Sequence, residues 1–212
     1  MKNKALQILA LAIAASPAAG WAQAPKNGTY ISTEDIQAVL KHAADTKRAI
    51  PDNSIRIVDM GNYQLGVAVI HRGAMGGTAN PGGNAAAANP APACGEQRTG
   101  ATGPTGILHD DTAESYVVIS GGATLIMGGT IVNGRRSAAD SEVTTILNGP
   151  SCSGTMVGYT SRQVKTGDVI IIPEHVPHGF SAIPDHITYL SIRPDLKKVL
   201  QHGYVNPALK NQ

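Results

Sequence analysis

The chain has 212 residues, of which 42% are hydrophobic and 15% are charged, and its formal net charge is +2. This length and apolar content suit one domain, and a second full domain is not expected. The small net charge gives no indication of a basic surface that would bind nucleic acid or anionic lipid. Only 4% of the residues are aromatic, which argues against a surface on which bases stack.

The N-terminal residues have the three-part layout of a secretory signal. Two lysines precede an apolar run over residues 5–19, which is too short to span a bilayer, and small residues follow. We expect residues 1–22 to be a signal peptide cleaved after Ala22, because cleavage after Ala24 would leave Pro25 just behind the cut. The alternative is a buried N-terminal helix. Export predicts a periplasmic or secreted protein with no membrane-spanning segment after signal removal.

Residues 23–52 are expected to lead into the domain through one amphipathic helix. The segment 32–35, Ser-Thr-Glu-Asp, supplies an N-cap side chain and first-turn carboxylates. Apolar residues then recur at helical spacing up to about Lys47, namely Ile36, Val39, Leu40 and Ala43.

From residue 53 to residue 193 the pattern changes to short apolar or β-branched runs separated by turn residues, which is typical of an all-β sandwich or barrel. The predicted strands are residues 55–60, 63–72, 114–120, 123–127, 155–164, 169–172 and 187–193. Residues 73–106 are dominated by Gly, Ala, Asn and Pro, which predicts a long surface loop. Residues 133–153 are expected to be a second weakly structured region.

The two cysteines, Cys94 and Cys152, are predicted to form a disulfide. In an oxidising compartment a pair of cysteines is more often bonded than free. Neither has a histidine or cysteine close by in the sequence that would suggest a metal site. The bond would pin the far end of the 73–106 loop to the 133–153 region.

The C-terminal residues 194–212 are expected to be a short helix and tail. Pro194 and Asp195 open the segment, and Gly203 follows it, which indicates a helix over residues 194–200. The predicted fold class is therefore mainly β with a helix at each end.

Two segments carry residue types that bind metals. In residues 106–122, His109 stands at a strand end and Glu114 starts the next strand five residues later, so a hairpin can bring the two together. In residues 167–180, a glycine turn, a continuous apolar strand and a proline-bounded loop lead to His178.

These segments resemble the two motifs of the cupin superfamily, and the resemblance covers residues 53–193. It implies a double-stranded β-helix, a jelly-roll barrel whose motif side chains point inward and hold one divalent metal. Glu114 takes the glutamate position of the first motif, and His178 takes the histidine position of the second. The glycine and proline positions of the motifs are matched by Gly121, Gly167 and Pro173.

The histidine pair of the first cupin motif, HxH, is matched only in part. Counting back from Glu114 makes His109 the second histidine and leaves Ile107 at the first. Counting forward from Gly103 instead places His109 at the first histidine position and Asp111 at the second. In this register one residue is missing before the glutamate position. We prefer the first register because it keeps the hairpin, and Asp111 is then a reserve ligand. The resemblance implies three protein ligands, which are His109, Glu114 and His178.

The resemblance implies one divalent metal ion, which we expect to be Zn, Fe, Mn, Cu or Ni. Two imidazoles and a carboxylate leave open positions, as in non-haem iron sites and some catalytic zinc sites. Folding outside the cytosol favours zinc or copper, which come higher than iron and manganese in the general affinity order.

Three further residues are candidates for proton transfer beside the metal. They are Tyr116, His175 and His71. His175 stands where the second cupin motif has its middle glycine and is more typical of a rim position. His71 ends a strand, where a lone histidine is more often hydrogen-bonded and structural.

The leading hypothesis is an exported, metal-dependent enzyme that acts on a small organic molecule. The reaction could be oxygenation, isomerisation, lyase chemistry or decarboxylation, because this fold does not determine function. The alternatives are a module that binds a small ligand without chemistry and an accessory protein whose degenerate barrel lacks the metal. The resemblance also implies that a homodimer can form through an edge strand.

Overall fold

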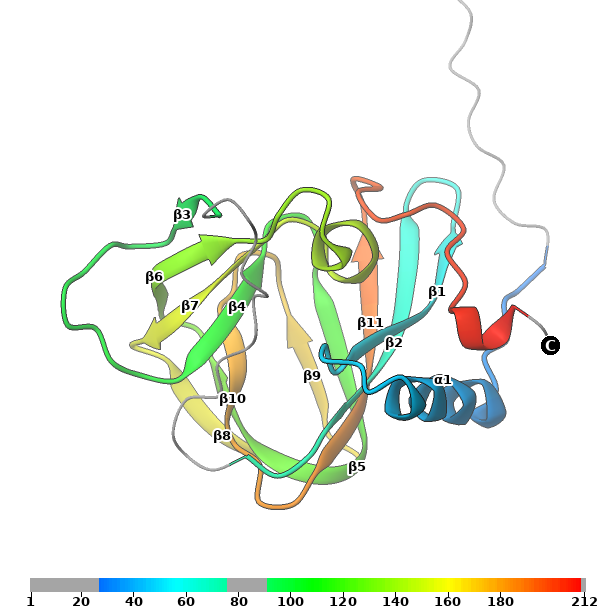
Figure 1. Ribbon diagram of the computed structural model, residues 1–212, viewed down its shortest axis with the longest axis horizontal. Helices are drawn as coiled ribbons and strands as arrows, with labels where there is room; N and C mark the ends of the chain where they lie inside the picture. Colours follow the sequence, from blue (N-terminus) through cyan, green and yellow to red (C-terminus); the bar gives the residue numbers. More distant parts are fainter. Residues whose placement is uncertain (1–26, 76–90, 211–212) are drawn as a thin grey trace, which may run out of the picture.

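The computed structural model describes residues 27–75 and 91–210 (Figure 1). The predicted signal peptide and the middle of the predicted 73–106 loop lie outside the described residues. Within them, one continuous antiparallel sheet folds over into two halves that enclose the core.

The two halves of the sheet share one strand, β5, Glu114–Met127. The first half contains β1, Asp52–Asp59; β2, Gln64–Arg72; β11, Ile187–Asp195; and β9, Val169–Ile172, beside the start of β5. The second half contains β8, Thr160–Lys165; β10, His178–Ala182; β4, Thr105–His109; β7, Ser151–Val157; β6, Thr130–Arg136; and β3, Ala93–Cys94. The predicted mainly β, jelly-roll barrel class is confirmed.

A bend at Gly121 lets β5 serve both halves. Before the bend β5 pairs with β11 and β9, and after it with β10 and β8. Gly121 has a φ of 74°, and a Cβ there would lie 2.1 Å from the backbone oxygen of His186. A side chain is therefore excluded at this point, which explains the glycine near the end of the 106–122 segment.

The helix α1, Thr33–Asp45, forms as predicted and covers the outer face of the first half near β1 and β2. Its N-terminus has a capping box between Ser32 and Asp35. Val39 packs against Ile55, Val69 and Leu209 in an outer cluster. The larger core lies between the two halves, with members from β2, β5, β8, β9 and β11.

The helix predicted over residues 194–200 is absent, because the first two residues of that segment continue β11. The buried Asp195 carboxylate then accepts the backbone N–H groups of Val199 and Leu200 and holds the chain in a turn. The local pattern suggested a helix start, but the ladder between β11 and β2 determines the outcome. The short C-terminal helix is instead a 3₁₀ turn at Pro207–Leu209.

Two regions predicted as weakly structured contain regular elements. β3 lies within residues 73–106, and β4 begins at Thr105. β6 extends into the 133–153 region, where a π-helical turn, η1, also covers Val143–Leu147. Strand pairing and the disulfide hold these regions in a regular structure, which their amino-acid composition does not predict.

The predicted disulfide joins Cys94 of β3 to Cys152 of β7 across a sequence separation of 58 residues. Both cysteines are buried, in a small cluster with Ile126, Ile131 and Met156. The bond therefore ties the edge strand β3 to the second half of the sheet.

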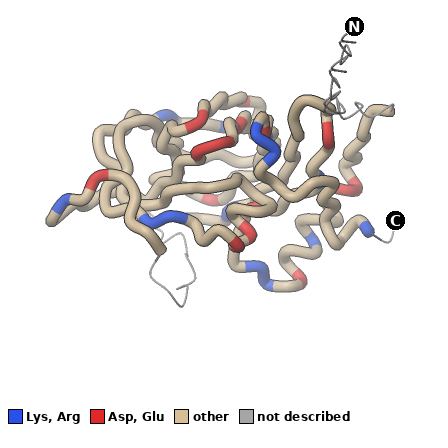
Figure 2. The backbone as a smooth tube through the Cα atoms, turned by 90° about the horizontal axis from the view of Figure 1, so that it is seen from above, with Lys and Arg blue, Asp and Glu red and all other residues tan. Residues whose placement is uncertain are grey.

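No helix of residues 27–75 and 91–210 is long and apolar enough to cross a membrane. Figure 2 shows basic and acidic residues interspersed along the described backbone. This distribution agrees with the formal net charge of only +2.

Candidate metal centre

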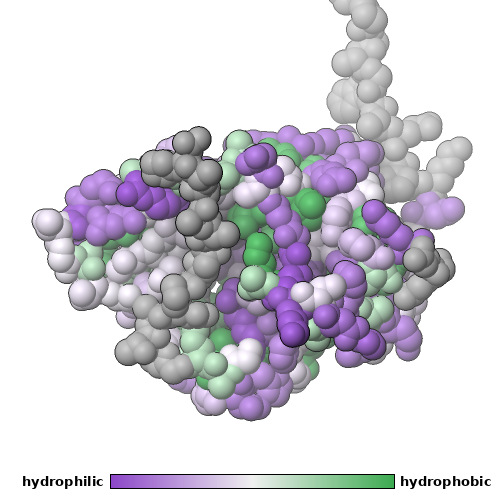
Figure 3. All heavy atoms as spheres, viewed as in Figure 1, coloured by the Kyte–Doolittle hydropathy of each residue, from purple (hydrophilic) through white to green (hydrophobic). Residues whose placement is uncertain are grey.

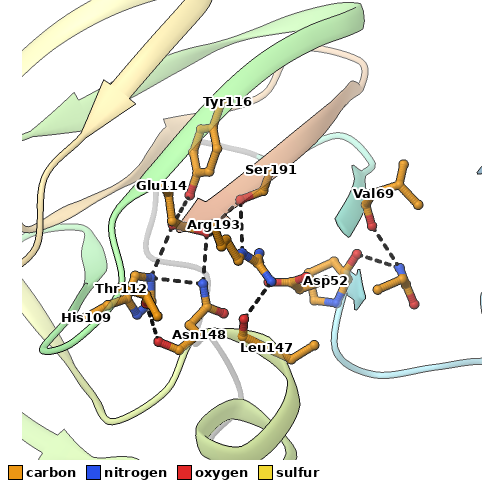
Figure 4. Close-up of polar contacts among 12 residues, drawn as sticks. Asp52, Val69, His109, Thr112, Glu114, Tyr116, Leu147, Asn148, Ser191 and Arg193 are labelled. Atoms are coloured by element: carbon orange, nitrogen blue, oxygen red, sulfur yellow. Dashed lines mark hydrogen bonds and ion pairs between the residues drawn. The ribbon is translucent and has the colours of Figure 1, made fainter. Parts of the chain in front are cut away.

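The two remote segments that carry the candidate metal ligands meet inside the barrel. His109 ends β4, Glu114 starts β5 and His178 starts β10. All three side chains are buried, and each offers a ligand atom within 4.8 Å of the other two. These three residues are called the His-Glu-His cluster below, and Figure 4 shows two of them, His109 and Glu114.

The hydrogen bonds of His109 fix which of its ring nitrogens carries the hydrogen. The Ser151 hydroxyl donates to the backbone oxygen of Gly149, so it can only accept from Nδ1 of His109, 2.8 Å away. Nε2 of His109 therefore presents a lone pair, and it accepts from the Asn148 side-chain amide at 3.2 Å. Burial lowers the pKa of His109, which keeps the ring neutral.

His178 is oriented in the same way by the backbone. Its Nδ1 donates to the Val176 oxygen at 2.9 Å, so in the neutral ring Nε2 carries the lone pair. This Nε2 is buried and has no hydrogen-bond partner among the described residues, although Oε2 of Glu114 lies 3.0 Å away. A buried polar atom in this state calls for an explanation.

A cation between the three side chains would supply that explanation. Nε2 of His109, Nε2 of His178 and Oε2 of Glu114 are all electron-pair donors that converge on one another. The oxygen is 3.2 Å from the first nitrogen and 3.0 Å from the second. Ligands that share one ion at about 2.0–2.1 Å are themselves about 2.9–3.4 Å apart. The residues present therefore fit a divalent metal with imidazole and carboxylate ligands.

The other oxygen of Glu114 is fully occupied by donors from the protein. Oε1 accepts from Arg193 at 2.9 Å, from Ser191 at 2.8 Å and from Asn148 at 2.8 Å (Figure 4). Burial raises the pKa of the Glu114 carboxyl, but Arg193 and His109 outweigh burial and hold that pKa well below its usual range. The Glu114 carboxylate is therefore charged and held in one orientation, in which only Oε2 faces the two imidazoles.

Arg193 connects the cluster to the N-terminal part of the domain. Its guanidinium donates to Glu114, to the carboxylate of Asp52 at the start of β1 and to the backbone oxygen of Leu147. The sequence did not predict a role for Arg193, Ser191, Asp52 or Asn148. On β11, Ser191 and Arg193 alternate with residues that point outward, and this pattern could have predicted that both side chains point into the barrel. No sequence pattern indicates that Asp52 and Asn148 lie near the cluster.

Tyr116 is the one proton-transfer candidate that reaches the His-Glu-His cluster. It lies two residues after Glu114 on the same face of β5, and its hydroxyl donates to Oε2 of Glu114 at 2.8 Å. Burial and the nearby carboxylate raise the pKa of Tyr116 well above its ordinary value, so the phenol keeps its proton at neutral pH.

The other candidates lie outside the cluster. His175 is exposed, but its backbone N–H donates to the oxygen of His109 and supports the end of β4. His71 is exposed on β2 and contacts the Thr188 hydroxyl. Asp111, the reserve ligand, pairs with Lys197.

A cavity of about 220 Å³ opens beside the cluster, between the two halves of the sheet. Figure 3 shows apolar residues gathered in the hollowed centre of this face. Its apolar lining includes Ile50, Met75, Ile107, Leu147 and Phe180. Its charged lining residues, apart from histidines, are Asp52, Arg72, Glu114 and Arg193.

No protein-family model matches the chain, and no curated protein matches it. Among solved structures it is similar to a DMSP lyase, DddQ, from Ruegeria pomeroyi, with 13% identity over 66% of this chain and 42% of the other, at a TM-score of 0.32. It is also similar to hydroxypropylphosphonic acid epoxidase from S. wedmorenis, with 14% identity over 67% of this chain and 50% of the other, at a TM-score of 0.31. The chain spans half or less of the length of these proteins, and the likeness is distant.

Proposed function

We propose that this protein is an exported member of the cupin superfamily that holds one divalent metal and acts as an enzyme on a small organic molecule. The observation that carries the proposal is the convergence of three electron-pair donors, from His109, Glu114 and His178, in the wall of a cavity. The metal is one of Zn, Fe, Mn, Cu or Ni.

A degenerate barrel without metal accounts less well for this arrangement. In such a barrel each buried polar atom should have a hydrogen-bond partner. That holds for Oε1 of Glu114 and for both Nδ1 atoms, but Nε2 of His178 has no hydrogen-bond partner among the described residues. Keeping this nitrogen opposite a charged carboxylate is costly unless a cation lies between them.

The protein side chains around the cluster suit chemistry on a bound molecule. A divalent ion here would supply a Lewis acid that polarises a substrate oxygen or activates water or oxygen. The Tyr116 phenol keeps its proton beside the cluster and can donate a hydrogen bond to a substrate atom. The apolar part of the lining lowers the local dielectric constant and so strengthens the electrostatic contacts within the cavity.

Export is proposed from the N-terminal sequence, with cleavage after Ala22. The Cys94–Cys152 disulfide supports it, because such bonds persist in oxidising compartments and are rare in the cytosol.

The test is metal-dependent conversion of small molecules. Protein loaded with each of the five metals is incubated with a mixture of small organic acids, alcohols and phenols, and the mixture is followed by mass spectrometry. We expect at least one compound to be consumed, and Glu114→Gln to abolish the consumption. A compound that is retained unchanged by the protein would instead indicate a binding module, and protein that takes up no metal would contradict the metal-dependent enzyme.

A further inference from the structure

Arg72 places a guanidinium in the wall of the cavity without a carboxylate partner. It is the last residue of β2 and lines the cavity that contains the His-Glu-His cluster. Its one side-chain hydrogen bond among the described residues runs from Nε to the Tyr189 hydroxyl at 3.5 Å. No ion pair of Arg72 occurs among the described residues, and the segments 1–26, 76–90 and 211–212 contain no Asp or Glu.

The two acidic residues of the cavity form their ion pairs with another guanidinium, although the Asp52 carboxylate attracts Arg72 at longer range and its Oδ1 has no hydrogen-bond partner among the described residues. Asp52 and Glu114 both pair with Arg193, and Glu114 also faces the two histidines. A guanidinium stays charged at any physiological pH, and a partly buried charge without a counter-ion is costly. The Arg72 guanidinium therefore has donors that no described residue takes up, and these are available to a partner from outside the chain.

Arg72 and the cluster lie along one wall of the cavity. The Tyr189 ring, next to Arg72, is 4.4 Å from the Tyr116 ring between centroids. The Tyr116 hydroxyl in turn contacts Glu114. A small molecule held at Arg72 can therefore extend over the two tyrosines and reach the cluster.

The charge of the cavity also favours an anion. Two guanidinium groups and two carboxylates cancel one another, so a divalent ion at the cluster would leave two positive charges in excess. One guanidinium and one phenol provide a small number of hydrogen-bond donors, and the guanidinium donors lie in one plane. This arrangement matches a planar carboxylate better than a tetrahedral dianion such as phosphate. The apolar lining suits a short hydrocarbon or aromatic body.

We propose that Arg72 binds the carboxylate of the substrate, with the Tyr189 hydroxyl beside it, and that the substrate class is small organic carboxylates. This inference rests on the proposed function for the role of the bound molecule. Arg72 is a specificity-determining residue here, because it holds the end of the molecule remote from the reacting atoms.

The experiment compares acids with their neutral amides. Full-length protein, metal-free and zinc-loaded, is titrated with acetate, butanoate and benzoate and with acetamide, butanamide and benzamide by calorimetry. At least one carboxylate should bind about tenfold or more tightly than its amide, since a hydrogen-bonded charge pair contributes about that much. Arg72→Gln should remove the preference in the metal-free protein, where no zinc can ligate the carboxylate, and Arg72→Lys should retain part of it.

Arg162→Gln is the matched control, because Arg162 is an exposed residue on β8 outside the cavity and its loss should leave the preference intact. The inference is wrong if no carboxylate binds the metal-free protein more tightly than its amide, if metal-free Arg72→Gln keeps the preference, or if inorganic phosphate binds the metal-free protein more tightly than every carboxylate. Failure of the proposed function is a separate result, seen as absent zinc uptake while the metal-free protein still prefers carboxylates through Arg72.

Discussion

Nε of Arg193 lies 2.9 Å from Oε1 of Glu114, and both side chains are only 2% exposed. This buried ion pair joins the last strand of the barrel to the first residue of β5. It both keeps the carboxylate charged and leaves its other oxygen for the two imidazoles. The fold and the candidate metal centre therefore depend on the same contact.

Replacing Arg193 by methionine should destabilise the protein strongly. The change leaves Glu114 and Asp52 without their cation, and an uncompensated buried charge costs about 3–5 kcal/mol. Urea unfolding of the metal-free protein measures the loss. Arg162→Met, on the exposed face of β8, is the control and should change the unfolding free energy little. A loss for Arg193→Met as small as that of the control would show that the pair is not important for stability.

Replacing Ser151 by alanine should weaken metal binding while leaving all three ligands in place. The Ser151 hydroxyl accepts from Nδ1 of His109 and so directs the Nε2 lone pair into the cluster. Loss of such an orienting partner typically lowers metal affinity about 10–100-fold. Competition against a chelator gives the affinity. Ser161→Ala, on exposed β8, should match the wild type, and an unchanged affinity in Ser151→Ala would rule out this orienting role.

Acid should destabilise the metal-free protein in two stages. The folded pKa of His109 lies below its ordinary value of 6.5, so below that pH the unfolded chain takes up a proton that the folded chain does not. The folded pKa of Glu114 lies well below 4.5, so its stabilising contribution is present above that pH and is lost as the pH falls further.

The pH dependence is measured by urea unfolding at a series of pH values. The unfolding free energy should fall between neutral pH and about pH 5, and the slope there should be smaller in His109→Gln. Equal slopes in the two proteins would show that burial of a neutral His109 does not contribute.

Reduction of the Cys94–Cys152 bond should destabilise the fold. Closing a loop of 58 residues restricts the unfolded chain and stabilises the folded state by about 4 kcal/mol in the chain-entropy description. Thermal unfolding with and without reductant measures this effect, and the double variant Cys94→Ser, Cys152→Ser should be insensitive to reductant. Equal melting temperatures for the oxidised and reduced protein would contradict the prediction.

Much of the barrel could be predicted from sequence because its strands are bounded by turn residues. The β1, β2, β9 and β11 segments were predicted to within a few residues of their bounds. The sequence split β5 at Gly121-Gly122, because a glycine pair usually marks a turn, whereas here it marks a bend within one strand. β6 was missed, and its pairing with β3 and β7 depends on residues remote in the sequence.

The three cluster residues could be named from sequence because each lies at a strand end within a short motif. Their partners could not, because Asn148 and Asp52 approach Glu114 and Arg193 only through tertiary packing. Arg72 is a similar case, since its lack of an acidic partner is visible only when the neighbours of β2 are known.

The metal content of the purified protein tests the central claim most directly. After loading with zinc and removal of excess ion, elemental analysis should find one ion per chain in the wild type and much less than one in Glu114→Gln, which keeps the shape of the side chain but not its charge. A wild-type protein that holds no ion, or a Glu114→Gln variant that holds as much as the wild type, would contradict a metal centre formed by His109, Glu114 and His178.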